Sequence, residues 1–331
     1  MTVRVQSGEG AALAHANRLV WGVHLAVAAL LLLLQFVLPP FHHGMLARIM
    51  VLASYAIGYN LLLGYTGLMS LGHAMFFAAG MYGTGLTVYY LGFGALPAIV
   101  IGLLASIAVA LVIGWITLRT TGVSFLIVTM MFAQAFFLAT LYFNRITGGD
   151  QGLVLAGRLP PLHLGPLTLN LAQPGVKYNV ALVVFTACVL LGLWLVRSPA
   201  GRVLVAIREN EERARLIGYN TFHYKWLALT ISGAVSGLAG STYTLLFSYL
   251  GSSFASILYS IYPLLWTLVG GVGTIIGPLV GATMMTYVVD ITSGYTTAYL
   301  IVVGAALVIL IMRFPQGIMG AVRARWPQWV P

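Results

Sequence analysis

Long apolar runs dominate the chain, and short polar or glycine- and proline-containing segments separate them. The first run, residues 19–38, carries no charge and has the length that a helix needs to cross about 30 Å of hydrocarbon. It continues into "PPFHH" instead of a small-residue cleavage site, so we expect an anchor that is retained. The pattern predicts ten candidate spans in all, over residues 19–38, 45–64, 74–91, 96–118, 123–143, 178–196, 226–248, 257–272, 276–292 and 297–312.

Residues 144–177 form the first of two segments that are too long and polar to be simple turns. The segment begins "NRITGGDQG" and contains four prolines, which indicates a folded-back loop with little regular structure. We expect it on the extracytoplasmic side, where it would cover an entrance. A plain connector is the alternative, although connectors in compact proteins are usually shorter.

The second polar segment, "RSPAGRVLVAIRENEERARLIGYNTFHYK", holds three of the six acidic residues of the chain. Ser198 and Pro199 are typical of a helix start, and Gly218 is typical of a helix stop. Opposite charges recur at i,i+4 spacing and apolar residues share one face, so we expect one amphipathic helix within residues 198–224, on the cytoplasmic side. The charge pairs are Arg208–Glu212, Glu209–Arg213 and Glu211–Arg215, and the apolar face comprises Val203, Ile207, Ala214 and Ile217. Such a helix either lies on lipid headgroups or docks on a soluble partner, and its three carboxylates favour docking.

A glycine-rich stretch, "GYNLLLGYTGLMSLGHAMFFAAGMYG", covers residues 58–83. Within lipid, non-helical backbone is tolerated only where it is buried in protein or lines a watery cavity. We therefore expect a short broken or re-entrant element from Tyr65 to Gly72, at the inner side of the bundle. His73 taken alone is more typical of a satisfied interior histidine than of a ligand. The candidate solute-pathway residues here are Asn60, Thr66, Gly67, Ser70, Gly72 and His73.

Two further glycine clusters follow. "LVGGVGTIIGPLVGA", residues 268–282, is expected to turn the chain between two spans, and it adds Gly271 and Gly273 to the candidate pathway. Small residues recur at three- and four-residue spacing over residues 232–240, which predicts a close-packing helix face. For all three clusters the alternative is helix packing without solute contact.

Composition places the chain in the membrane, because 60% of its residues are hydrophobic and 7% are charged, against about a quarter charged in soluble domains. The fold class expected is an all-α integral membrane protein. If the N-terminus is cytoplasmic, twelve of the sixteen basic residues fall inside, so the net charge of +10 reports orientation and not nucleic-acid binding. Both termini are then cytoplasmic, with tails at residues 1–18 and 314–331 around a transmembrane domain at 19–313.

Several kinds of chemistry are missing from the sequence. The chain has no P-loop, and neither of its two lysines, Lys177 and Lys225, follows a glycine. No HExxH or GxSxG motif occurs, no metal site is indicated, and Cys188 in an apolar run predicts a buried, inert thiol. A membrane aspartyl pair of Asp150 and Asp290 has no further support. The spans contain no charged relay, so a driving force other than an ion gradient is expected.

The motifs "NLLLGYTGLMSLGHAMFFAAGMYG", "ITGGDQG", "SPAGRVLVAIRENEERARLIGYN", "SGAVSGLAGSTY", "LVGGVGTIIGPLVGA" and "RFPQGIMG" follow one another in that order. From about residue 45 to 320 the chain resembles the permeases of branched-chain amino-acid ABC transporters, specifically the M-type subunit. The resemblance implies half of a solute pathway in the bacterial inner membrane, paired with an H-type second permease. It also implies two cytoplasmic ATPases that bind ATP and Mg, a periplasmic solute-binding protein, and no cofactor in this chain.

Residues 211–218 are similar to the EAA-type coupling loop of such permeases, whose helix docks in a groove on the ATPase. The coupling residues that the resemblance implies are Glu209, Glu211, Glu212, Arg213, Arg215 and Gly218. Two departures leave the solute open: "SIYPLLWTLVGG" stands where the family often has "SIELLLMVVLGG", and "GGDQG" replaces "GGSDG". Branched-chain or related amino acids are expected, with urea, amides or aromatic and aliphatic acids as alternatives. An ion-coupled secondary transporter is the alternative from another class.

Overall fold

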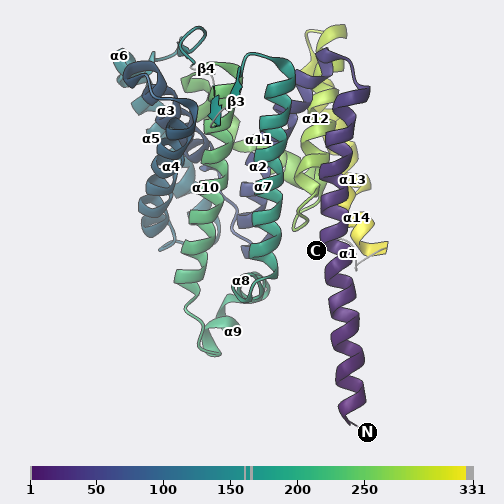
Figure 1. Cartoon of the computed structure of the whole chain (residues 1–331). Coiled ribbons are helices and arrows are strands. Elements are labelled where there is room, and N and C mark those ends of the chain that lie inside the picture. Colours follow the sequence, from purple (N-terminus) through teal and green to yellow (C-terminus); the bar gives the residue numbers. More distant parts are fainter. Residues whose placement is uncertain (1, 160–161, 165–166, 326–331) are drawn as a thin grey trace.

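The computed structural model describes the chain except residues 1, 160–161, 165–166 and 326–331. It is a bundle of helices with roughly parallel axes, capped at one end by loops and short strands (Figure 1). The helices that follow the apolar runs are α1 (Thr2–Val37), α2 (Pro40–Thr66), α3 (His73–Leu91), α4 (Ala95–Thr117), α5 (Gly122–Tyr142), α7 (Pro174–Arg197), α10 (Thr221–Phe247), α11 (Ile257–Gly270), α12 (Gly277–Tyr295) and α13 (Tyr299–Arg313). The remaining elements are α6 (Asn144–Thr147), α8 (Pro199–Glu209), α9 (Glu211–Leu216), α14 (Ile318–Arg325), the 3-10 helix η1 (Ser252–Ala255), β1 (Leu153–Val154), β2 (Leu162–Leu164), β3 (Leu167–Leu169) and β4 (Tyr249–Leu250).

A helix covers each of the ten apolar runs, which confirms an all-α membrane protein. Length and composition alone make six described segments long and apolar enough to cross a membrane. They are Leu19–Val37, Phe41–Thr66, Ala95–Thr117, Gly122–Tyr142, Pro174–Arg197 and Ile301–Arg325. Helix α11 is apolar but shorter. The chain is therefore a multi-pass protein, and the count of ten spans stays a prediction.

Helices α2, α3, α4 and α10 pack together at the centre of the bundle. A Cβ atom added to Gly80 would overlap the backbone of Gly237, and one added to Gly240 would overlap the backbone of Phe77. The Ser106 hydroxyl of α4 donates to the Gly233 carbonyl of α10 at 2.7 Å. Small residues thus let these backbones approach closely, as membrane helices do in the absence of a hydrophobic driving force. The predicted close-packing face at residues 232–240 is confirmed.

The two ends of the bundle differ. The start of α1 lies toward the end that carries α8 and α9, whereas α6 and the strands lie at the opposite end (Figure 1). Helix α1 begins at Thr2, so residues 2–18 are helical and continuous with the first apolar run, and their place outside the membrane stays a prediction. The 144–177 and 198–224 segments therefore occupy opposite ends, as the sequence predicted. Which end faces the cytoplasm stays a prediction.

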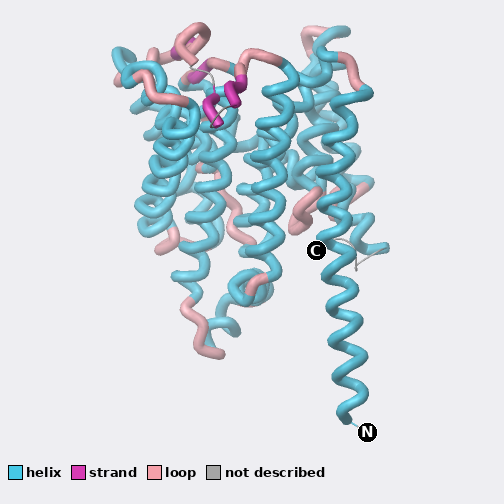
Figure 2. The backbone as a smooth tube through the Cα atoms, in the orientation of Figure 1, coloured by secondary structure: helices cyan, strands magenta, loops and turns pink. Residues whose placement is uncertain are grey.

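The segment 144–173 contains more regular structure than its prolines suggested. Strand β1 pairs antiparallel with β4, which follows α10, and β2 pairs with β3 (Figure 2). Gly152 adopts a φ of 70° where the chain turns against the Leu250 carbonyl, a conformation that favours glycine. The loop is thus joined to the end of α10, and α7 begins at Pro174.

The single amphipathic helix expected after Ser198 is wrong, because the helix breaks at Asn210. The Asn210 side chain accepts from the Arg213 amide at 2.9 Å and caps α9, as short polar side chains do when they compete with the helix backbone. The spacing of Arg208 with Glu212 and of Glu209 with Arg213 needs an unbroken helix. Within the described chain, Glu211 forms the ion pairs, with Arg215 at 3.2 Å and Lys225 at 2.7 Å.

The apolar face of this segment is also shorter than expected. Val203, Ile207 and Ala214 are buried together. Ile217, however, is 72% exposed, because α9 ends at Leu216 and the next residue leaves the predicted face. The start of α8 is as predicted, since the Ser198 hydroxyl accepts from the Gly201 amide at 3.1 Å.

Candidate solute cavity and coupling surface

The predicted break near Tyr65–Gly72 lies between α2 and α3. Helix α2 continues through Thr66, and Gly67 ends it with a φ of 73°. Residues 67–72 are not helical, and α3 begins at His73. A broken element is thus present, two residues shorter at its start than the sequence indicated.

Asn60 joins this region to the turn between α11 and α12, residues 271–276. Its side-chain nitrogen donates to the Thr274 carbonyl at 2.8 Å, and its side-chain oxygen accepts from the Gly273 amide at 2.9 Å. The Tyr65 hydroxyl donates to the Gly273 carbonyl at 3.0 Å. A Cβ atom on Gly64 would lie 2.7 Å from the Gly273 nitrogen, so only glycine permits this approach. The glycine-rich stretch 58–83 and the glycine cluster 268–282 are therefore in direct contact.

Arg208 connects the same region to α8. Its guanidinium donates to the Gly64 carbonyl near the end of α2, and its side chain lies against Gly67. Arg323 of α14 donates to the Gly273 carbonyl at 3.2 Å. Sequence reasoning missed this contact and assigned Arg208 to a pair with Glu212. The sequence offered only a general indication of this contact. The last carbonyls of any helix, α2 included, need hydrogen-bond donors from outside that helix.

Of the other candidate pathway residues of the first cluster, Gly67 is exposed, whereas Thr66, Ser70 and Gly72 are buried. The Ser70 hydroxyl accepts from the Gly72 amide at 3.1 Å, and the Thr66 hydroxyl donates to the Leu62 carbonyl at 2.5 Å. Backbone of α5 closes over Gly72, where an added Cβ would lie 2.7 Å from the Thr129 carbonyl oxygen. The hydroxyls of Ser70 and Thr66 bond to backbone groups inside the protein, and their contact with solute stays a prediction.

His73 is fully buried between α3, α2 and α10. Its Nε2 lies 2.8 Å from the Ser232 hydroxyl, which donates to the Gly58 carbonyl at 2.5 Å. The ring also packs edge-on against Tyr59 and Phe76. This geometry is that of an interior histidine that helps hold three helices together.

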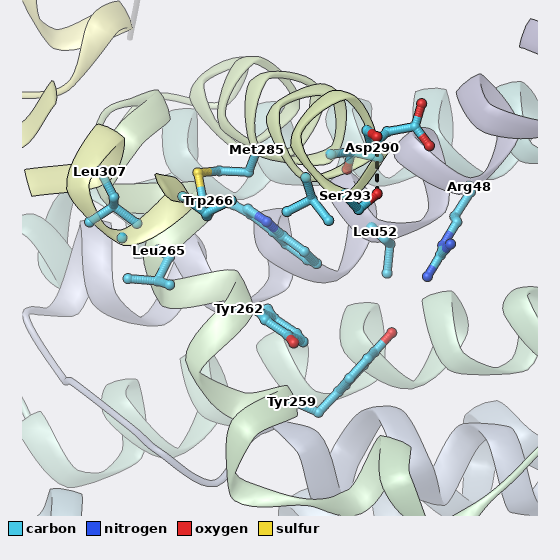
Figure 3. Close-up of a pocket in the computed structure, with 14 residues that line it drawn as sticks. Arg48, Leu52, Tyr259, Tyr262, Leu265, Trp266, Met285, Asp290, Ser293 and Leu307 are labelled. Atoms are coloured by element: carbon cyan, nitrogen blue, oxygen red, sulfur yellow. Dashed lines mark hydrogen bonds between the residues drawn. The ribbon is translucent and has the colours of Figure 1, made fainter. Parts of the chain in front are cut away.

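A cavity of about 560 Å³ lies elsewhere, between α2, α11, α12 and α13. Arg48, Asp290 and Ser293 lie toward one end of it, and Leu265 and Leu307 lie toward the other (Figure 3). Rings from α11 line the space between the two ends. The rings of Tyr262 and Trp266 stack at 5.8 Å with an interplanar angle of 14°, and Tyr259 packs edge-on against Tyr262 at 5.8 Å.

No role in binding was predicted from the sequence for any of these side chains. Asp290 was considered only as part of an aspartyl pair, and the stretch "SIYPLLWTLVGG" only as a departure that leaves the solute open. The sequence did contain one indication: Arg48 and Asp290 are isolated charges in two apolar runs. Charged residues within membrane spans are rare and often functional.

At the other end of the protein, Glu211 stabilises the junction of α9 and α10. Lys225 is 3% exposed, and its ammonium contacts the Glu211 carboxylate. Burial alone would raise the pKa of Glu211, but the hydrogen bonds from Lys225 and Thr221 and the charges of Lys225 and Arg215 outweigh it and hold this pKa below its usual value.

The tip of α9 leaves other side chains open to solvent. Glu209, Glu212 and Arg213 are exposed, and Leu216 is 85% exposed beside Ile217. Gly218 follows with a φ of 95°, which favours glycine at the end of a helix. The tip therefore presents an apolar centre with charges around it. No group of three or more residues that could hold a metal ion occurs within the part of the chain that the structure describes.

A multi-pass helical bundle with a partly polar cavity and a projecting helical tip is the architecture of a membrane transport permease. The family described as "branched-chain amino acid transport system / permease component" matches residues 43–312, and the chain belongs to this family. It is a permease subunit of an ABC importer, as its motifs predicted.

Curated relatives from the same kind of system are similar to the chain. It is 25% identical over 295 residues to the high-affinity branched-chain amino acid transport system permease protein LivM of Escherichia coli (strain K12), covering 83% of this chain and 69% of the relative. LivM of Salmonella typhimurium (strain LT2) matches with the same identity and coverage. LivH of Escherichia coli (strain K12) is 23% identical over 286 residues, covering 81% of this chain and 91% of the relative. No solved structure gives a significant match.

Proposed function

We propose that this chain forms half of the solute pathway of an ATP-driven importer for branched-chain or related amino acids in the bacterial inner membrane. Family membership and the names of the relatives support the amino-acid solute. Because LivM and LivH proteins both resemble the chain, an H-type second permease is the proposed partner. Two ATPases supply ATP hydrolysis, with ATP and Mg bound there, and a periplasmic binding protein delivers the solute.

The proposed topology has ten spans and both termini in the cytoplasm. One helix lies over each apolar run. An even number of spans returns the chain to its starting side, and the excess of basic residues assigns that side to the cytoplasm. The loop at 144–173 then faces the binding protein, and α8 and α9 face the ATPases.

The observation that carries the ATP-driven proposal is the exposed tip of α9. Leu216 and Ile217 lie outside the apolar runs and are mostly exposed at the surface of the chain. An apolar centre with charges around it is typical of a protein interface. Val203, Ile207 and Ala214 bury the other face of the segment and fix the tip on the bundle. In this proposal Glu209, Glu212, Arg213 and Gly218 shape the docking face, and Glu211 and Arg215 brace it.

A double variant, Leu216→Ser with Ile217→Ser, tests this assignment. We expect the variant to insert in the membrane and pair with the second permease, but to lose the ATPases on co-purification and to lose ATP hydrolysis stimulated by the loaded binding protein. A matched control is Val154→Ser, which removes an exposed apolar side chain at the opposite end of the bundle. Normal stimulated hydrolysis in the double variant would show that the tip does not dock the ATPase.

A further inference from the structure

Two charged side chains face outward from helices whose other residues are mostly apolar. Arg48 and Asp290 are both exposed and both line the cavity. Arg48 lies eight residues into α2, about 12 Å along its axis, and Asp290 lies five residues before the end of α12, about 7 Å along its axis. Both charges lie near one end of a predicted span, where a charged side chain reaches the polar membrane surface or a solute path. This end of the face therefore meets polar surroundings, as the entrance of a solute path does.

The cavity is divided chemically along its length. One cation and one anion, Arg48 and Asp290, lie toward the same end, and apolar side chains lie toward the other (Figure 3). A neutral solute such as urea has no charge to match either side chain, and a simple carboxylic acid matches Arg48 alone. A zwitterion carries a group for each, since a guanidinium binds a carboxylate through parallel hydrogen bonds and a carboxylate accepts from an ammonium.

Aromatic rings line the cavity between its charged end and its apolar end (Figure 3). Tyr259, Tyr262 and Trp266 come from one helix and follow one another in ring contact. Rings attract other rings in stacked or edge-on contacts, beyond the effect of buried area. The volume of about 560 Å³ lies within the range of about 300–1,000 Å³ that small-molecule sites usually have.

We propose that this cavity is the solute site of the permease and that it selects amino acids with an aromatic side chain. The carboxylate of the solute binds Arg48, its ammonium binds Asp290, and its ring packs against Tyr259, Tyr262 and Trp266. The site rests on the proposed function, because it lies on the path of an amino-acid importer. It makes the solute more specific: aromatic amino acids are preferred over small branched ones.

Uptake of labelled L-phenylalanine and L-leucine by cells that carry the complete importer tests the charged end. We expect Arg48→Gln and Asp290→Asn each to lower uptake of both amino acids about tenfold or more, as loss of a charged hydrogen bond does. Arg48→Lys keeps the charge and should restore part of the uptake. The matched control is Arg145→Gln, which removes an exposed charge of α6 outside the cavity.

The aromatic wall is tested separately by the ratio of the two uptake rates. Tyr262→Leu should lower the preference for L-phenylalanine over L-leucine about twofold to tenfold, the range that one ring contact provides. Tyr295→Leu, which changes an 88% exposed ring at the end of α12 outside the cavity, should leave the ratio unchanged.

Binding is measured without transport by thiol labelling. In a Cys188→Ala background, Ser293→Cys places one thiol at the charged end of the cavity. L-Phenylalanine should slow its modification by a polar thiol reagent, and urea should not. Equal labelling rates with and without L-phenylalanine would overturn the site.

The outcomes separate this site from the proposed function. If the wild-type importer takes up amino acids with ATP and the variants of Arg48 and Asp290 match it, the site is overturned and the importer stands. If those variants no longer co-purify with the second permease, the charges belong to a subunit interface and the site is again overturned. If the wild-type chain supports no ATP-driven uptake of any amino acid, the proposed function fails, and protection of the thiol by L-phenylalanine still decides whether the cavity binds.

Discussion

At the scale of single residues, the side chain of Asn60 connects two segments that are distant in the sequence. It satisfies the amide of Gly273 and the carbonyl of Thr274, and so holds the turn 271–276 against α2. Buried backbone groups that lose their partners cost far more than an average hydrogen bond contributes, because they were desolvated on folding. The polar side chain in an apolar run is thus explained by two backbone groups in a distant turn.

Replacing Asn60 by leucine, which is similar in size, should therefore lower stability. We expect a loss of about 1–3 kcal/mol for the unpaired backbone groups, seen as a lower Tm of the purified complex in detergent. Asn179→Leu, on the exposed side of α7, serves as the control. An unchanged Tm for Asn60→Leu would mean that the turn is not held by this side chain.

Glu211 should stabilise the protein in a way that depends on pH. Because the pKa of Glu211 is lower in the folded chain than in the unfolded one, its contribution is full above the ordinary glutamate pKa and is lost as the pH falls through the lowered value. Near neutral pH we expect Glu211→Gln to cost about 1 kcal/mol, since the carboxylate is partly solvated and its charge is screened. The Tm difference from wild type should close at acid pH, and Glu212→Gln should show no such difference. A difference that persists unchanged at acid pH would contradict this role.

At the scale of elements, α8 connects α9 to the end of α2. Val203 and Ile207 hold its buried face, and Arg208 reaches the end of α2 beside the turn 271–276. A movement of α9 against an ATPase would therefore reach the two glycine-rich segments directly. This contact gives the coupling segment a physical route to the predicted solute pathway.

Arg208→Met keeps much of the side-chain length and removes the hydrogen bond to Gly64. We expect ATPase binding to persist while solute uptake falls about tenfold, the factor for one charged hydrogen bond. Arg202→Met, at an exposed position of the same helix, is the matched control. Loss of ATPase binding in Arg208→Met would make the arginine part of the docking tip, and unchanged uptake would exclude it from coupling.

Helices and breaks could be predicted from the sequence where neighbouring residues alone determine them. The lengths of the apolar runs predicted where the long helices lie, and the glycines of residues 67–72 marked a real break. The break at Asn210 was missed because i,i+4 charges and a capping side chain compete for the same residues, and spacing alone does not decide between them. Gly64 contacts Gly273, and Arg48 and Asp290 line the same cavity. Both arrangements depend on packing between distant segments, which no local sequence pattern contains.

At the scale of the whole molecule, the proposed orientation places the α8–α9 end in the cytoplasm. Single cysteines at Ser7, Arg325 and Gln151, each in a Cys188→Ala background, test it. An impermeant thiol reagent should label Gln151→Cys in intact cells, and should label Ser7→Cys and Arg325→Cys only after the cells are opened. Labelling of either terminal position from outside intact cells would contradict the topology with both ends inside.

The most direct measurement of the central claim is solute uptake by proteoliposomes that contain the chain with its second permease and the ATPases. The account predicts that uptake of L-leucine and L-phenylalanine needs ATP on the α8–α9 side and the solute-binding protein on the other. Uptake should also continue when ionophores remove all ion gradients. Uptake that is driven by an ion gradient in the absence of ATP would contradict it.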